Sequence, residues 1–281
     1  MERSILSPSE NAESLVEIGS ARTNLTFVKE FLLGILGGAF IAFAAQGSNV
    51  AIHTIDSVGL SKTLAGALFA TGLMMVVISG AELFTGNSLI VISCLQRKSK
   101  WVSMFRNWLF VYLGNFAGSL LIAYFILHSG QLGFSEGLLG GFTIKIAVYK
   151  TGLSFESAFF MGILCNWLVC IAIWMASASK DIAGKILAIF FPIWLFITSG
   201  FEHSVANMYY IPAGILAKAN EEFAQAAISL GVSAEQIANL NWGTLFTRNL
   251  IPVTLGNIVG GAFFVGTIYW FVYLRKGKSS R

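Results

Sequence analysis

The sequence predicts an all-α integral membrane protein with six transmembrane helices, arranged as an inverted 3+3 repeat in which two helices are interrupted. Three observations predict this fold. The chain of 281 residues is 56% hydrophobic and 11% charged, whereas a soluble domain carries about 25% charged residues, and its mean hydropathy is +0.73. Six stretches are apolar enough to cross a bilayer, and the two halves of the chain repeat one another.

The predicted spans follow one another along residues 27–274, and each contains the roughly 20 residues that a transmembrane helix needs. They cover 27–50, 63–95, 105–128, 155–177, 186–216 and 248–274. The second and fifth spans are much longer than one crossing requires, and Gly, Ser and Thr occur near the middle of each. These features predict broken helices or re-entrant loops.

A polar segment, residues 1–26, precedes the first span and lacks the apolar core of a signal peptide. Ser7, Pro8 and Glu10 have the spacing of a helix start, which predicts a short helix.

Most of the 18 Lys and Arg residues, including those of the basic tail 275–281, lie on one side of the predicted spans. The positive-inside rule then predicts a multi-pass protein of the cell's inner (plasma) membrane with both termini in the cytoplasm. The net charge of +4 indicates topology, and no nucleic-acid partner is expected.

The repeat is visible in three pairs of segments. They are "NWLFVYLGNFAG" (107–118) with "NLIPVTLGNIVG" (249–260), "FLLGIL" (31–36) with "FFMGIL" (159–164), and "GAE" (80–82) with "GFE" (200–202). Because each half has an odd number of spans, the second half must lie upside down relative to the first, about an axis in the membrane plane. Folds of this kind have their binding or permeation site at the midplane, between the two interrupted helices.

Three ionisable residues lie at these interruptions. Glu82 and Glu202 occupy matching points of the repeat, and His203 follows the second. Charged groups at this depth cost several kcal/mol unless they face protein, water or a pathway. We interpret the two glutamates as structural braces that accept hydrogen bonds from unpaired backbone N–H groups of the broken helices, with direct substrate contact as the alternative. For His203 we favour a pore-lining role over buried packing, because it exchanges protons near neutral pH.

Other polar residues complete the candidate site. The hydroxyl of Thr85 can donate a hydrogen bond to an anion or bond the local backbone. Asn115 lies in a glycine-rich stretch and is expected to bond between helices, whereas Asn166 and Asn257 suit either that role or pore lining. Lys150, in a predicted outer loop, can raise the local anion concentration at a pore mouth or be an ordinary solvated lysine.

The cysteines Cys94, Cys165 and Cys170 all fall in apolar spans and match no zinc or redox spacing. They are interpreted as small packing residues. No metal site or cofactor is expected.

Five motifs together resemble the formate–nitrite transporter family over about residues 29–275: "GAELFTGN", "NWLFVYLGN", "ILCNWLVC", "SGFEHSVANM" and "NLIPVTLGNIVGG". The sequence is most similar to the hydrosulfide channel branch. The resemblance implies an aquaporin-like fold in residues 27–274, assembled as a homopentamer in which each protomer has its own pore for small monovalent anions such as hydrosulfide, formate and nitrite. Hydrosulfide is the favoured substrate.

The resemblance also implies roles for individual residues. His203 corresponds to the central histidine of the family, Thr85 lies in its mobile loop "GAELFT", and Lys150 matches its mouth lysine. The apolar constrictions fall on Phe69, Leu73, Leu83 and Phe196. One departure is Glu82, because formate channels have Asp at this position.

These features predict an anion channel or a proton-coupled anion transporter. In the proton-coupled form, His203 supplies a proton so that the anion crosses the apolar constriction as a neutral acid. Two alternatives are an aquaporin-type channel for neutral solutes and an intramembrane enzyme. The paired Asn-Pro-Ala motifs of the first are missing, and so are the Gly-x-Ser-x-Gly and His-Glu-x-x-His motifs of the second. A purely structural membrane protein would not need His203.

Overall fold

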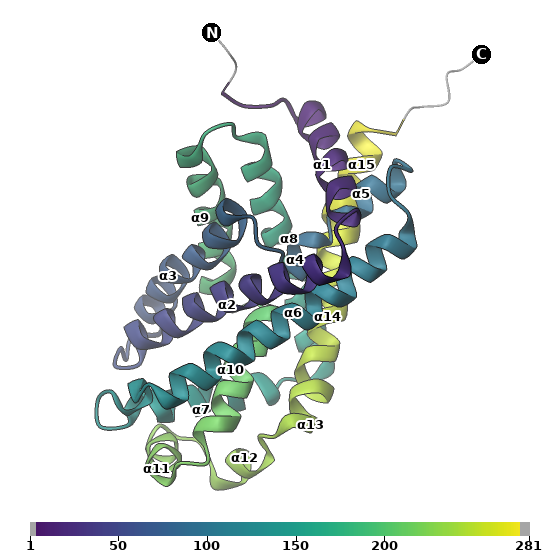
Figure 1. Cartoon of the computed structure of the whole chain (residues 1–281). Helices are drawn as coiled ribbons and strands as arrows, with labels where there is room; N and C mark the ends of the chain where they lie inside the picture. The colour runs from purple at the N-terminus through teal and green to yellow at the C-terminus, as the bar shows by residue number, and fades with distance from the viewer. Residues whose placement is uncertain (1–3, 276–281) are drawn as a thin grey trace, which may run out of the picture.

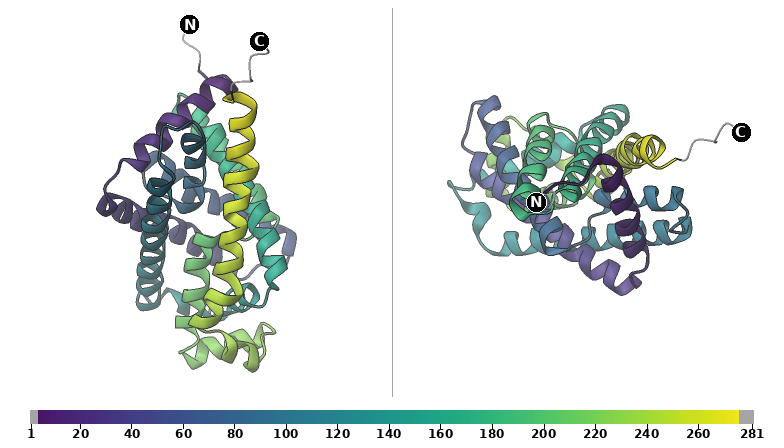
Figure 2. Two further views of the ribbon diagram at one scale, coloured as in Figure 1. Left: turned by 90° about the vertical axis from the view of Figure 1, so that its right-hand side faces the viewer. Right: turned by 90° about the horizontal axis from the view of Figure 1, so that it is seen from above.

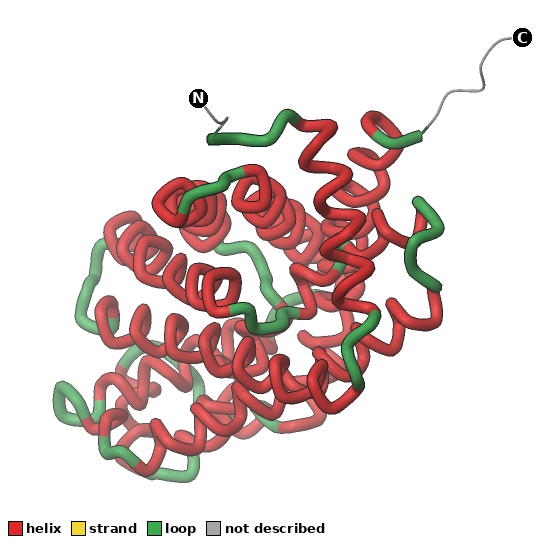
Figure 3. The backbone as a smooth tube through the Cα atoms, turned by 45° about the horizontal axis from the view of Figure 1, so that its top comes forward, coloured by secondary structure: helices red, strands yellow, loops and turns green. Residues whose placement is uncertain are grey.

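The structure, a computed structural model, describes residues 4–275, and every regular element within this range is helical. The chain forms helices joined by short loops (Figure 3). Five helices are long and apolar enough to cross a membrane: α2 (Phe27–Ile52), α3 (Val58–Ser79), α6 (Trp101–His128), α8 (Phe155–Ala178) and the continuous helix Trp242–Tyr273. The last comprises α13 (Trp242–Thr244), α14 (Ile251–Ile258) and α15 (Ile268–Tyr273), joined by π-helical turns, and runs along the length of the molecule (Figure 2).

The two long apolar stretches of the sequence are each divided by a short non-helical break. In the first, α3 ends at Ser79 and is followed by α4 (Phe84–Asn87) and α5 (Ile90–Leu95). In the second, α9 (Ile182–Thr198) is followed by α10 (Ser204–Ala217). Each break begins at a glycine with positive φ, 80° at Gly80 and 74° at Gly200, a conformation that costs other residues about 1–2 kcal/mol.

Glycines bring the longest helices into close contact. A Cβ atom added at Gly114 or Gly118 of α6 would collide with the carbonyl oxygens of Phe31 or Ile35 on α2. In the second half, Gly256 of α14 and Gly260 in the π-helical turn after it lie against the carbonyls of Phe159 and Ile163 on α8 in the same way. Small residues at these positions let the helix backbones approach within van der Waals contact, which is the main source of helix association inside a bilayer.

Three helices lie in segments for which the sequence analysis predicted none. Helix α7 (Leu138–Thr151) replaces the expected outer loop, and α11 (Glu221–Ser229) and α12 (Ala234–Asn239) follow α10. The expected loop position of Lys150 is therefore wrong, since this residue lies in the last turn of α7. Two glycines form the contact surface of α7, because Gly140 and Gly141 pack against Phe223 and Ala226 of α11.

Helix α1 (Pro8–Thr23) lies at the end of the molecule where α15 also ends, and α11 and α12 lie at the opposite end (Figure 1). Ser7 is the N-cap of α1, and its backbone N–H donates to Glu10 at 2.7 Å. Helix α1 packs on α5 and α8, so it is part of the folded body. Of the predicted basic tail, residues 276–281 lie outside the described residues.

Candidate functional site

An asparagine from a neighbouring helix holds the first break. Asn115 of α6 accepts a hydrogen bond from the backbone N–H of Phe84 at 2.9 Å. Its amide group donates to the carbonyl oxygens of Gly34 at 2.7 Å and Glu82 at 2.9 Å. The backbone N–H of Glu82 donates to Leu33 of α2 at 3.1 Å. The N–H groups of Glu82 and Phe84 and the carbonyl of Glu82 are therefore bonded to α2 and α6.

The second break is held in the same way. Asn257 of α14 accepts from the backbone N–H of Ser204 at 2.9 Å and donates to the carbonyls of Gly162 at 2.8 Å and Glu202 at 3.0 Å. The backbone N–H of Glu202 donates to Met161 of α8 at 3.3 Å. All of the amide's bonds go to the backbone, which favours the bracing role for Asn257 over the predicted contact with substrate.

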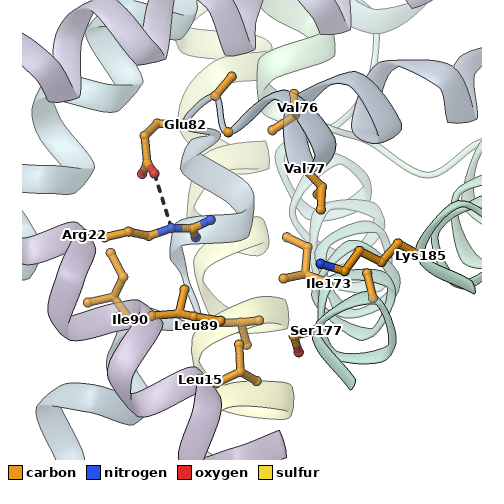
Figure 4. A pocket seen from close by; sticks show the side chains of 15 residues that line it. Leu15, Arg22, Val76, Val77, Glu82, Leu89, Ile90, Ile173, Ser177 and Lys185 are labelled. Atoms are coloured by element: carbon orange, nitrogen blue, oxygen red, sulfur yellow. Dashed lines mark ion pairs between the residues drawn. The ribbon is translucent and has the colours of Figure 1, made fainter. Parts of the chain in front are cut away.

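The two glutamates accept hydrogen bonds from side chains instead of the backbone N–H groups that the sequence analysis expected. Glu82 Oε1 lies 3.2 Å from Arg22 Nε of α1 (Figure 4). Its Oε2 accepts from Asn87 Nδ2 at 2.6 Å. Asn87 also donates to Asn107 Oδ1 at 2.7 Å and accepts from Arg22 Nη1 at 2.8 Å. The correction has a physical cause, because Asn115 already satisfies the backbone at this break and the carboxylate is left to pair with a cation.

Glu202 has an equivalent set of partners. Lys150 Nζ donates to Oε1 at 2.8 Å, and Oε2 accepts from Asn207 Nδ2 at 2.6 Å and from Asn249 Nδ2 at 3.3 Å. Both members of the ion pair are largely buried, with side-chain exposures of 13% and 1%, and Lys150 Nζ also lies 5.2 Å from the ring centre of Tyr210. Lys150 is thus a partner of Glu202 rather than a freely solvated lysine.

His203 is the N-cap of α10 and lies between the two breaks. Its Nδ1 accepts from the backbone N–H of Ala206 at 3.0 Å, and its Nε2 lies 2.9 Å from Thr85 Oγ1 on α4. Because a backbone N–H can only donate, Nδ1 carries no proton, and the neutral imidazole carries its proton on Nε2, facing Thr85. The fold therefore brings together two predicted site residues that are 118 positions apart.

Asn166 of α8 links the same region to α14. Its amide donates to the backbone carbonyls of Thr85 at 3.2 Å and Asn257 at 2.7 Å, and to Ser88 Oγ at 3.2 Å. It is fully buried. These bonds fix the backbone behind the Thr85 hydroxyl, so Asn166 supports the orientation of Thr85 toward His203.

A central cavity of about 10 Å³ adjoins the imidazole of His203. Its walls are apolar, with Phe69 and Phe196 packed edge to face at 5.9 Å between ring centres. All four residues predicted as constrictions line it, and so do three apolar residues that the sequence analysis missed. The lining is Ile41, Phe69, Leu73, Leu83, Val169, Ile193, Phe196 and His203. The missed residues lie on uniformly apolar helices, and no feature of the sequence marks which face turns inward.

Two larger cavities adjoin the central cavity from opposite sides. The Arg22 cavity, about 220 Å³, is lined by Arg22, Glu82 and Lys185 among other residues. The Lys150 cavity, about 470 Å³, is lined by Lys150 and Glu202, among others. Leu83 and His203 of the central cavity directly follow Glu82 of the Arg22 cavity and Glu202 of the Lys150 cavity in the chain, so the central cavity lies between the other two. A polar chamber with a paired cation therefore lies on each side of an apolar, nearly closed centre.

The sequence analysis missed five members of this network: Arg22, Asn87, Asn107, Asn207 and Asn249. Asn87 and Asn207 each follow their glutamate by five residues, so the repeat itself was a usable signal. Arg22 lies in the polar segment before the first span, and no pattern in that segment distinguishes it. Within residues 4–275 the three cysteines are free and buried, and no group of three or more His, Cys, Asp and Glu is close enough to hold a metal ion.

Comparison with known proteins places the chain in a family. The sequence matches the family described as "Formate/nitrite transporter" over residues 9–271. It is 37% identical to the "Probable formate transporter" of Methanothermobacter thermautotrophicus, over 98% of this chain and 100% of that protein. It is 36% identical to the "Formate channel FocA" of Escherichia coli (strain K12), over 97% of this chain and 96% of that protein.

The fold agrees with this assignment. A solved structure described as "Pentameric formate channel with formate bound" is similar with a TM-score of 0.78 at 38% identity, over 89% of this chain and 98% of that one. These relatives are named for formate, so they support the family but not the favoured hydrosulfide branch. On the sequence match and the relatives together, the chain belongs to the formate/nitrite transporter family.

Proposed function

We propose that this protein is a channel for small monovalent anions and that formate is one of its substrates. The observation that carries the proposal is the position of His203 and the Thr85 hydroxyl at an apolar, nearly closed centre between two cavities that each contain a cation. Relatives named as formate channels, at 36–37% identity, support formate. Hydrosulfide, favoured by the sequence motifs, is the second substrate to test, and nitrite is the third.

The proposed path runs from one cavity through the central cavity to the other, inside one protomer with an inverted 3+3 arrangement of helices. The central cavity has about the volume that a single water molecule needs. An anion therefore passes only when the apolar side chains of Leu83 and Phe196 move, and it leaves most of its water behind. Such hydrophobic constrictions reject ions that are large or hold their hydration strongly.

In this proposal His203 lowers the cost of the apolar passage by proton transfer. The imidazole is first protonated on Nδ1 and gives up the hydrogen bond from Ala206; the Nε2 proton then passes to the anion. The neutral acid leaves, and a change of tautomer restores the bond to Ala206. Losing an N-cap bond costs about 0.5–2 kcal/mol, whereas a bare carboxylate in an apolar medium costs on the order of tens of kcal/mol in idealised estimates. Transfer of the Nε2 proton removes the charges of the imidazolium and of the anion together, so a weak-acid anion crosses as a neutral molecule.

The assembly and its orientation are part of the same proposal. Large apolar side chains are exposed along α2, α6 and α8, and they require either lipid or neighbouring protomers around the chain. Together with the solved pentameric relative, these surfaces support a homopentamer. The distribution of Lys and Arg supports an orientation in which the Arg22 cavity faces the cytoplasm.

A stopped-flow assay tests the proposal. Liposomes with the purified protein receive inward gradients of formate, nitrite or hydrosulfide, and a pH dye inside records uptake. We expect formate uptake well above that of empty liposomes, and unchanged permeability to glycerol. Glycerol permeation without anion uptake would favour an aquaporin-type channel. Native mass spectrometry of the same sample checks the pentamer, and a mass of one or two chains would contradict it.

A further inference from the structure

The Arg22 cavity contains one cation whose charge is not paired. Its titratable lining residues are Arg22, Glu82 and Lys185. Arg22 and Glu82 form an ion pair at 3.2 Å, whereas Lys185 Nζ has no hydrogen bond or ion pair within residues 4–275. Figure 4 shows Lys185 reaching into the cavity from α9, opposite Arg22. The cavity therefore carries one net positive charge, and Lys185 is its source.

The surroundings of Lys185 do not cancel this charge. The nearest acidic residue in the chain, Asp181, is the N-cap of α9, and its carboxylate accepts from Gly184 N–H at 2.7 Å. Asp181 lines a different cavity, together with residues 4–6 of the N-terminal segment. Lys185 also lies in the first turn of α9, where the helix dipole adds positive potential.

The cavity at the other end differs in its charge pattern. The Lys150 cavity contains Lys62, which also has no partner within the described range, and Lys145, whose ammonium group donates to the carbonyl of Leu230 at 2.9 Å, but its lining includes the carboxylate of Asp56. The paired cations, Arg22 and Lys150, are neutralised by Glu82 and Glu202. Neither paired cation leaves a net field that attracts an anion. Both cavities carry a net positive charge, but in the Arg22 cavity this charge comes from one lysine, and the only carboxylate in the lining is the paired Glu82.

From this pattern we infer that Lys185 is the residue that attracts the permeating anion into the Arg22 cavity. The inference rests on the proposed channel function and adds a specific role to a residue outside the narrow centre. A cavity with low-dielectric walls and one sign of charge concentrates counter-ions and raises the rate of access. The Arg22–Glu82 pair then has a different role, which is to hold the first break and α1 together.

The inference predicts a dependence on both charge and salt. Formate uptake is measured in liposomes of zwitterionic phosphatidylcholine for the wild type and for Lys185→Gln, Lys185→Glu and Lys185→Arg. At an ionic strength of about 0.01 M, where the Debye length is about 30 Å, we expect Lys185→Gln to reduce uptake roughly three- to tenfold. Lys185→Glu should reduce it further, and Lys185→Arg should stay close to the wild type.

Salt separates attraction from a structural effect. At about 1 M ionic strength the Debye length is about 3 Å, and the Lys185→Gln and wild-type rates should converge. Lys100→Gln is the matched control, because it removes the same charge from an exposed N-cap residue that does not line the cavity; we expect it to have no effect.

Two outcomes would overturn the inference. One is a Lys185→Gln rate equal to that of the wild type at low salt, and the other is a loss of uptake that persists unchanged at high salt. If the wild-type protein transports formate in the same liposomes, either result leaves the proposed function intact. A wild-type protein that takes up no formate would contradict the proposed function itself.

Discussion

Asn115 and Asn257, 142 positions apart in the chain, make the same three hydrogen bonds at the two breaks. Each accepts from the backbone N–H that follows its break and donates to two carbonyl oxygens, all at 2.7–3.0 Å. Both residues are fully buried. Two interrupted helices are therefore held open inside the protein by one repeated interaction, and this keeps Thr85 and His203 at a fixed separation.

Replacing Asn115 with Ala should destabilise the protein strongly. The change leaves the N–H of Phe84 and the carbonyl of Glu82 without the partner that Asn115 supplies, and each buried unpaired group costs about 1–3 kcal/mol. We expect a clear fall in the melting temperature of the purified protein, measured by intrinsic fluorescence in detergent. The control is Ser119→Ala, on the same helix as Asn115, which removes a single bond of 3.3 Å to the carbonyl of Gly38 on α2. Equal melting temperatures for the two variants would show that Asn115 does not hold the break.

Gly118→Ala should disrupt the packing of α6 on α2. The added methyl group would overlap the carbonyl of Ile35, which is backbone and cannot move aside, so we expect a loss of folded protein, or a destabilisation of several kcal/mol. Gly47→Ala on α2 adds the same methyl group where no atom lies within 4 Å and should be tolerated. Size-exclusion chromatography after membrane extraction compares the two. Normal yield of Gly118→Ala protein would contradict the close contact.

Widening the central cavity should increase flux. Phe196→Ala and Leu83→Ala each remove apolar bulk from the wall opposite His203, so we expect faster formate uptake and weaker exclusion of larger anions such as lactate. Leu195→Ala is the matched control, because this side chain is on the same helix but 54% exposed. Unchanged selectivity in both cavity variants, with normal assembly, would mean that these residues do not form the filter.

His203→Asn should separate structure from proton exchange. Asn is a favoured N-cap residue, so its side chain can still accept from the backbone N–H of Ala206, and the fold should be retained. It cannot be protonated, however, and we expect the variant to lose the stimulation of formate uptake by acid, measured from about pH 5 to 8. Uptake rate and membrane current are measured together across this range. A well-folded variant with the pH profile of the wild type would rule out the proton-exchange role.

The positions of the two breaks follow from local sequence, but the partners of Glu82 and Glu202 do not. Gly80 and Gly200 each precede a glutamate by two residues within a long apolar stretch, so the pattern can be recognised from a short segment of sequence. The cations that pair with these carboxylates come from α1 and α7, which are 60 and 52 positions away from them respectively. The interpretation of the glutamates as acceptors for backbone N–H groups was wrong because it considered only the broken helix and left out Asn115 and Asn257.

The sequence by itself determined that the chain is helical, apolar enough for a membrane, and a member of the formate/nitrite transporter family, because hydropathy and motif spacing are properties of short segments. Only the tertiary structure decided that Nε2 of His203 faces Thr85, that Arg22 pairs with Glu82, and that Lys185 is left with an unpaired charge. These relationships depend on which faces of distant helices meet. In uniformly apolar helices no polar stripe marks the inward face, so the close packing at glycines such as Gly118 and Gly256 sets the rotation of each helix and the position of its side chains.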